Sequence, residues 1–442
     1  MLRKVDFRPI SLNDTSGCTD SKLSTCSGSQ ASMEMTGFIR KRLKLLDSSG
    51  IYRIIKDLLA AELTESRRMV GATQSQVLDH LGSWGPNTVL LERHKREGEH
   101  CLDLDSLERI AVASRINQFF RLHEWGVEDN LLRQQRIGDL AGLVEAVLLE
   151  EQPTWQRLTL LSSGTSGEPK ATTHQRRDLD AEVAGWNQWI DQPLRVLSLV
   201  PSHHLYGLIW TVLWPSANGL EVLDATNWGP GRWQREVAKG DVIVGFPLMW
   251  EFLLRSVGTF PAGVVGISSA GALPPSLWDL SIHQGLSRMI EVYGSTETGG
   301  VAARENATDP FRLAAHWTDR AEGLAELLPD HIDFESPTKF RILGRKDGAV
   351  KIGGSLVSLD DVARELRALD HILDCRVRRG GAGVRERLEA LVVTDLPAAE
   401  YSQIEQRIHR ELAQRLPAAA LPKRLAICAS LPVNAMGKVA QW

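Results

Sequence analysis

Segments with strand and helix patterns alternate along the middle of this 442-residue chain, and this alternation restricts its fold most strongly. Short apolar runs predict strands at 158–162, 195–200, 242–246, 264–268 and 289–293. Apolar residues at helical spacing lie between them, for example over 178–191 and 248–257. Strands separated by helices favour an α/β domain with a layered, largely parallel sheet, whose functional loops follow the carboxyl ends of the strands.

The regions on either side of this domain have different patterns. Residues 36–150 predict a helical N-terminal region, in which Leu107 and Ile110 belong to an apolar stripe. After 344, a small α+β lid-sized domain is expected, with its elements at 359–369, 376–378, 388–394, 400–416 and 424–428. Residues 1–35 are rich in Ser, Thr and Gly, which is typical of a disordered leader. These patterns leave 151–344 for the large α/β domain.

Charge and cysteine content narrow the class of protein. The net charge of -4 gives no reason to expect a nucleic acid or an anionic membrane as partner. No apolar run approaches the roughly 18–20 residues of a membrane span. The five cysteines are scattered and lack metal-ligand spacing, which favours free thiols in a reducing compartment. We therefore expect a soluble cytoplasmic protein.

A loop of small hydroxyl residues follows the first expected strand, over Ser162–Lys170 (SSGTSGEPK). Its glycines allow close approach of the backbone to an anion, its hydroxyl and N–H groups can donate to phosphate oxygens, and Lys170 adds positive charge. It is not a Walker A loop, because no Gly-Lys-Ser/Thr occurs. The stretch predicts a phosphate-binding loop, with a plain flexible surface loop as the alternative.

Three further stretches have the chemistry of a nucleotide site. Tyr293–Gly300 (YGSTETGG) offers an aromatic face for a base, a Thr for a phosphate and a carboxylate for Mg²⁺, although an ordinary Gly/Thr turn is the alternative. Gly344–Gly354 has two glycine clusters that flank charged residues, which suits a hinge. Leu431–Lys438 carries a Lys near the chain end, where a solvated lysine is the alternative.

These four stretches, in this order, resemble the adenylate-forming superfamily of acyl- and aryl-CoA synthetases, peptide-synthetase adenylation domains and luciferases. The resemblance covers about 158 to the C-terminus and implies an AMP-binding large domain over 151–344 and a mobile C-terminal domain over 345–442. It implies two reactions: a carboxylate attacks the α-phosphate of Mg·ATP, and a thiol then displaces AMP. The thiol would belong to CoA or to the phosphopantetheine of a carrier protein.

The resemblance also implies roles for single residues. Thr296 would contact the α-phosphate, Glu297 would bind Mg²⁺, and Lys438 would enter the site as the catalytic lysine. Arg345 would reach the ribose and Asp347 would be the hinge. The β- and γ-phosphates would lie against Ser163, Gly164, Thr165, Ser166, Gly167 and Lys170. The adenosine would lie between Tyr293, Gly294 and Ser295 and the strand end Ala270, Gly271 and Ala272.

The substrate side of the site is implied by Pro201–Gly207, which matches a family pattern. His204 would be the gate between the acyl pocket and the thiol tunnel, although a packing His in a turn is the alternative. Residues 245–250 would form a wall of the acyl pocket, and their aromatic side chains favour a flat aryl acid over other acyl groups.

Three features depart from the family pattern. The ribose-binding acid lacks its usual motif, so Asp330 is the first candidate and Asp333 the second. Only 47 residues separate Glu297 from Arg345, which implies a shortened third subdomain. Ser106 follows an Asp at an expected helix start, as in the phosphopantetheine site of carrier proteins, but an ordinary helix cap gives the same pattern.

The sequence thus predicts an ATP-dependent carboxylate ligase that adenylates an organic acid, aryl or acyl, and transfers it to a thiol. The competing hypothesis is a non-catalytic module that binds a nucleotide or adenylate, or a carrier-like interaction protein. Lys170, Glu297 and Lys438 occur together, and this favours an enzyme because a sensor has no need of an adenylation lysine.

Overall fold

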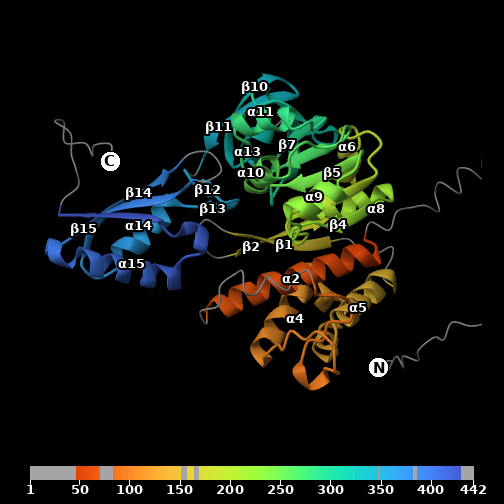
Figure 1. Cartoon of the computed structure of the whole chain (residues 1–442), viewed down its shortest axis with the longest axis horizontal. Coiled ribbons are helices and arrows are strands. Elements are labelled where there is room, and N and C mark those ends of the chain that lie inside the picture. Colours follow the sequence, from red (N-terminus) through yellow and green to blue (C-terminus); the bar gives the residue numbers. More distant parts are fainter. Residues whose placement is uncertain are drawn as a thin grey trace, which may run out of the picture. The chain divides into compact units, whose positions relative to one another are not determined.

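The computed structural model describes residues 46–69, 83–150, 157–163, 169–321, 323–346, 348–381 and 386–429 (Figure 1). All described residues belong to one compact unit. Within these ranges no helix has both the length and the apolar character needed to cross a membrane. Several predictions lie outside the described residues: the leader 1–35, the loop residues Gly164, Thr165, Ser166 and Gly167, the hinge Asp347 and the lysine Lys438.

A nine-stranded sheet in the order β10-β11-β9-β8-β7-β6-β5-β3-β4 organises the large domain. Its parallel half contains β4 (Glu221–Asp224), β3 (Arg195–Ser198), β5 (Asp241–Gly245), β6 (Val265–Ser268) and β7 (Arg288–Ser295). All five residues of β5 are buried, as expected of a central parallel strand covered on both faces. Helices α6 (Arg176–Trp186), α10 (Pro247–Ser256) and α11 (Pro275–His283) occur between strands, so the predicted α/β alternation is confirmed.

The other half of the sheet is antiparallel, and the sequence patterns did not predict it. It continues from β7 through β8 (Gly299–Arg304), β9 (Phe311–Leu313), β11 (Lys339–Arg345) and β10 (Asp330–Ser336). Most side chains of β10 and β11 are exposed or half-buried, so these strands lack a continuous apolar run. The sheet is therefore mixed rather than largely parallel.

The strand predicted at 158–162 also lies outside the parallel sheet. As β1 (Arg157–Ser163) it pairs antiparallel with β2 (Pro169–Gln175) in a separate two-stranded sheet, from Arg157–Gln175 to Ser163–Pro169. Leu158 and Leu160 are buried, whereas the β2 side chains from Lys170 onward are exposed or half-buried. The strands that flank the predicted phosphate loop thus form a hairpin, not one layer of the sheet.

Helices dominate the described part of the N-terminal region, as predicted, chiefly α2 (Ser48–Met69), α4 (Ser106–Phe120) and α5 (Ile137–Glu150). Their apolar side chains do not form a core of their own. A single hydrophobic cluster joins residues of α2, α4 and α5 to Trp186 of α6 and to Val244 and Ile290 of the sheet. The described part of this region is therefore packed into the large domain.

The apolar stripe predicted on α4 is buried at Ile116, Phe119 and Phe120 but not at its N-terminal end. Leu107 and Ile110 are 77% and 53% exposed, while the buried face carries Glu108, Val112 and Ile116. Asp105 caps the helix by accepting a hydrogen bond from the Glu108 backbone N–H at 2.8 Å, and the Glu108 side chain accepts one from Asp105 N at 3.2 Å. This capping box sets the helix start and turns Glu108 inward, which rotates Leu107 toward solvent.

The C-terminal region is α+β, as predicted. It begins with the hairpin β12 (Val350–Ile352) and β13 (Ser355–Val357). Helices α14 (Leu359–Arg367) and α15 (Tyr401–Arg415) share a separate core with a sheet in the order β14 (Ile372–Gly380), β15 (Arg387–Thr394), β16 (Arg424–Cys428). The boundaries of the predicted domains remain predictions.

Candidate active site

One cavity of about 680 Å³ gathers most of the described residues that the sequence assigned to the site. The predicted residues that line it are Lys170, His204, Ala270, Gly294, Ser295, Thr296, Glu297, Asp330 and Arg345. They come from β2, from the loops after β3 and β6, from β7 and its following turn, and from the ends of β10 and β11. Gly271, Ala272, Tyr293 and Ser106 do not line this cavity.

The turn after β7 is held by its own hydroxyl groups. Ser295 Oγ accepts hydrogen bonds from the backbone N–H groups of Glu297 and Thr298, both at 3.2 Å, and Thr298 Oγ1 lies 3.1 Å from Ser295 Oγ. His174 Nε2 on β2 lies 2.7 Å from the Thr296 carbonyl oxygen, and burial lowers the pKa of His174, so its neutral ring donates to this oxygen. The turn that carries Thr296 and the exposed Glu297 is thus fixed to the β1–β2 hairpin.

The acid and the arginine predicted for the ribose are neighbours in the sheet. Asp330 and Arg345 are paired residues of β10 and β11, and both line the cavity. Asp333, the second candidate, is exposed and does not line the cavity. The strand pairing therefore favours Asp330 as the ribose-binding acid, because it places a carboxylate and a guanidinium side by side.

Tyr293 faces away from the cavity, contrary to the prediction that it lines the adenine. Its neighbours Val292 and Gly294 line the cavity, and alternate residues of a strand point to opposite faces. The Tyr293 ring lies 5.7 Å from both Phe311 and Phe340, and its hydroxyl donates to Asp330 Oδ2 at 2.6 Å. Burial and this hydrogen bond raise the pKa of Tyr293, so it remains a donor that positions the Asp330 carboxylate.

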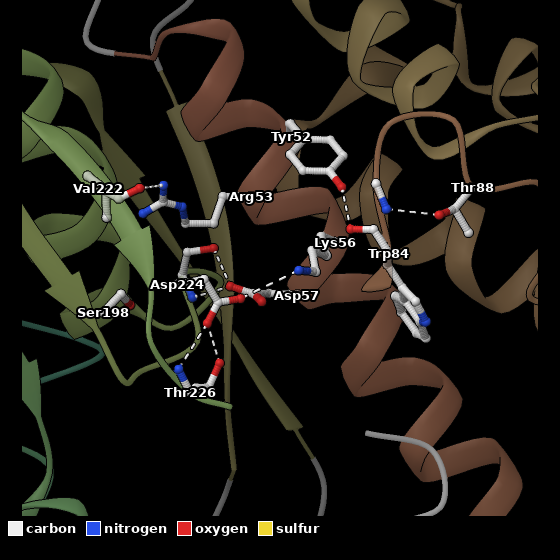
Figure 2. A network of polar contacts seen from close by, with 12 residues as sticks. Tyr52, Arg53, Lys56, Asp57, Trp84, Thr88, Ser198, Val222, Asp224 and Thr226 are labelled. Atoms are coloured by element: carbon white, nitrogen blue, oxygen red, sulfur yellow. Dashed lines mark hydrogen bonds and ion pairs between the residues drawn. The ribbon is translucent and has the colours of Figure 1, made fainter. Parts of the chain in front are cut away.

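The Pro201–Gly207 loop is braced from the N-terminal region. Asp57 of α2 accepts two hydrogen bonds from Ser202, at 2.7 Å from its backbone N–H and 2.6 Å from its hydroxyl. Figure 2 shows Asp57 within a polar network in which Arg53 donates to the carbonyl oxygen of Val222 on β4 at 3.0 Å. His204, two residues after Ser202, is exposed at the cavity wall. Helix α2 therefore positions the loop that carries the predicted gate.

We expect Asp57→Ala to lower the free energy of unfolding by about 1–3 kcal/mol, because two donors of Ser202 lose their acceptor in a buried place. Asp57→Asn keeps an acceptor oxygen and should lose less. It also removes a charge that is costly here, since burial raises the pKa of Asp57 to about 6. Urea denaturation of the three proteins measures the difference. Equal losses in the two variants would show that the hydrogen bonds contribute little.

The cavity also contains residues that the motifs did not assign. Glu182 of α6 and Trp210 line it, as does Lys351, which lies in the predicted hinge stretch but had no role. Phe246 lines the cavity from the predicted acyl wall, whereas Trp250 is buried in the core and donates from Nε1 to the Ile267 carbonyl oxygen at 3.0 Å. No sequence signal distinguishes Glu182 from the other acidic residues of its helix.

Comparison with known proteins agrees with the motifs. The family model described as AMP-binding enzyme matches residues 127–320. A 4-coumarate–CoA ligase of Halorhodospira halophila is 33% identical over 405 residues, which are 89% of this chain and 99% of that protein. A second protein of that description, from Cereibacter sphaeroides, is 33% identical over 416 residues, 90% of this chain and 97% of the relative.

A solved structure shares the fold. The amide bond synthetase McbA from Marinactinospora thermotolerans superimposes with a TM-score of 0.51 at 16% identity, and the match covers 88% of this chain and 92% of that chain. At this identity the similarity supports the architecture described above.

Proposed function

Because this chain belongs to the AMP-binding, adenylate-forming enzyme family and is an AMP-forming acid–thiol ligase, we propose that it adenylates an aryl acid and transfers it to CoA. One observation carries this proposal: Lys170, Thr296, Glu297, Asp330 and Arg345, which were predicted to bind Mg·ATP, share a cavity with the aromatic side chains of Tyr206, Trp210 and Phe246. Such walls suit a flat ring. The names of the relatives support CoA as the acceptor.

The cavity residues fit the charge that develops in the first reaction. When a carboxylate attacks the α-phosphate, negative charge grows on the phosphoryl oxygens and pyrophosphate leaves. The Thr296 hydroxyl would donate to an α-phosphate oxygen, and Lys170 would hold the departing phosphates. Asp330 would accept from the ribose hydroxyls beside Arg345.

A magnesium ion fits beside Glu297. Mg²⁺ commonly takes one or two carboxylates and completes its shell with phosphate oxygens and water. Among the described residues no group of three or more His, Cys, Asp or Glu side chains forms a metal site, so Glu297 would share the ion with the nucleotide. When bound, the ion neutralises charge on the phosphates.

The test is acid-dependent ATP–pyrophosphate exchange with cinnamic, benzoic and fatty acids, followed by thioester formation with CoA or a phosphopantetheinylated carrier protein. We expect exchange with aryl acids and a product with CoA. Exchange with none of the acids would favour the non-catalytic binding module. A product with the carrier alone would change the acceptor but not the first reaction.

We expect Lys438→Ala to reduce exchange by about 10²–10³-fold, because it removes a cation from the developing charge. Thioester formation from preformed adenylate should continue, since the resemblance gives Lys438 a role only in the first reaction. Lys423→Ala is the matched control: this exposed lysine of the C-terminal region does not line the cavity. Equal exchange in the two variants would contradict the assignment of Lys438.

We also propose a cytoplasmic location, where ATP, Mg²⁺ and CoA are available together. Among the described residues Cys101 and Cys375 are free thiols, as is typical of a reducing compartment.

A further inference from the structure

A buried carboxyl group forms part of the cavity wall. Glu182 lies in the middle of α6, is 6% exposed, and lines the cavity. Its Oε1 atom accepts a hydrogen bond from the Gly300 backbone N–H at 2.8 Å and another from Trp186 Nε1 at 3.3 Å. Within the described ranges no lysine or arginine pairs with it. Both protein donors contact Oε1, so no described protein group donates to Oε2.

The local backbone is built to admit this carboxyl group. A Cβ atom at Gly299 would lie 2.4 Å from Glu182 Oε2, and one at Gly300 would lie 2.8 Å from Oε1. Two consecutive glycines at the start of β8 are therefore needed for Glu182 to reach this place. Gly299 also has a φ of +77°, a conformation that glycine adopts readily.

The buried Glu182 carboxyl group lowers the stability of the folded protein. A carboxylate out of water is expensive without a cation or a full set of donors. Burial accordingly raises the pKa of Glu182 to about 7. An apolar side chain of similar size would suit the neighbouring Trp186 and Trp210 better, since these rings form the adjoining core.

Glu182 lies beside the hairpin that carries the predicted α-phosphate contact. Gly300 pairs with Gly294 across the β7–β8 hairpin, and the turn of this hairpin carries Thr296, the predicted α-phosphate contact. Glu182 therefore contacts the hairpin whose turn carries Thr296, and it lines the same cavity as Trp210 and Phe246.

We propose that the Glu182 carboxyl group recognises a hydroxyl group on the aromatic ring of the acid, by accepting a hydrogen bond from that hydroxyl at Oε2. This inference rests on the proposed function, because it assumes that an aryl acid occupies the cavity. A ring hydroxyl supplies the donor that the site lacks, and an unsubstituted or methoxylated ring leaves the buried carboxyl group unpaired. Sites that bind a substrate hydroxyl discriminate strongly against analogues without it.

The experiment measures kcat/KM of adenylation for 4-hydroxycinnamate, 4-methoxycinnamate and cinnamate. The wild-type enzyme should prefer the hydroxylated acid over each of the others by at least about tenfold. Glu182→Ala should reduce this ratio to near one, and Glu182→Gln, which keeps the shape and a neutral acceptor, should give an intermediate ratio. Both variants should retain activity with cinnamate, which shows that they fold. Asp180→Asn, an exposed carboxyl on the same helix outside the cavity, should keep the wild-type ratio.

The outcomes separate this inference from the proposed function. If the wild type adenylates aryl acids and the ratio is unchanged in both Glu182 variants, Glu182 does not recognise the ring hydroxyl and the proposed function stands. A parallel loss of activity with all three acids indicates a structural role for Glu182 and also overturns the inference. If the wild type adenylates no aryl acid, the proposed function itself is wrong.

Discussion

Replacing Gly207 by alanine is expected to lower adenylation by at least about 100-fold and the free energy of unfolding by about 3 kcal/mol or more. A Cβ atom at this position would lie 1.9 Å from the carbonyl oxygen of Pro201, far inside van der Waals contact. The Pro201–Ser202 backbone must then move away from Gly207, which lies in α7 (Leu205–Leu208). That movement displaces His204 from the cavity and weakens the hydrogen bonds from Ser202 to Asp57.

The matched control is Gly142→Ala in α5. No atom lies within 4 Å of a Cβ built at Gly142, and alanine favours a helix interior over glycine by about 1 kcal/mol. This variant should be slightly more stable than the wild type and equally active. Denaturant melts and pyrophosphate exchange measure both effects. Normal activity of Gly207→Ala would show that the loop tolerates the displacement.

The second large effect is expected in the pH dependence of stability. Burial raises the pKa of Glu182 from 4.5 to about 7, so the folded protein binds this proton more tightly than the unfolded chain. The contribution of Glu182 to the free energy of unfolding therefore falls as the pH rises from about 4.5 to about 7, and the loss is complete above that range. A shift of this size corresponds to about 3 kcal/mol.

Glu182→Gln removes this titration. Its stability should match that of the wild type near pH 4.5 and exceed it by up to about 3 kcal/mol at pH 8. Urea denaturation of both proteins at several pH values between 4.5 and 8 measures the difference. Two parallel curves would mean that the carboxyl group is better solvated than its position in the cavity wall implies.

The sequence predicts best those strands of the sheet whose two faces are both covered by other elements. Strands such as β5 carry a short run of consecutive apolar residues, and this run identifies them without tertiary information. β2 and β10 offer no such run, since their side chains are mostly exposed or half-buried. Local sequence patterns do not show which strand pairs with β1, so its pairing with β2 could not be predicted.

The site residues also fall into those that the sequence predicts and those that only the structure shows. Thr296, Glu297 and Arg345 belong to motifs, and the structure brings them to one cavity. Tyr293 belongs to a motif as well, yet the alternation of β7 turns its ring into the apolar cluster of Phe311 and Phe340. Glu182 has no motif: its partner Gly300 lies 118 residues away, so only the folded chain shows that the two meet.

The unbroken hydrophobic cluster across residue 150 has a consequence for protein engineering. One way to change the specificity of such a ligase is a chimaera, in which an N-terminal segment of one enzyme is joined to the catalytic part of another. A junction at 150 in this chain would divide one core between two parent proteins. It would also replace Asp57, which accepts the hydrogen bonds of Ser202 in the Pro201–Gly207 loop. Substrate specificity is better changed by substituting individual side chains of the cavity wall. Helices α2, α4 and α5 share one hydrophobic core with the sheet and helices that form the cavity, so they cannot be exchanged separately.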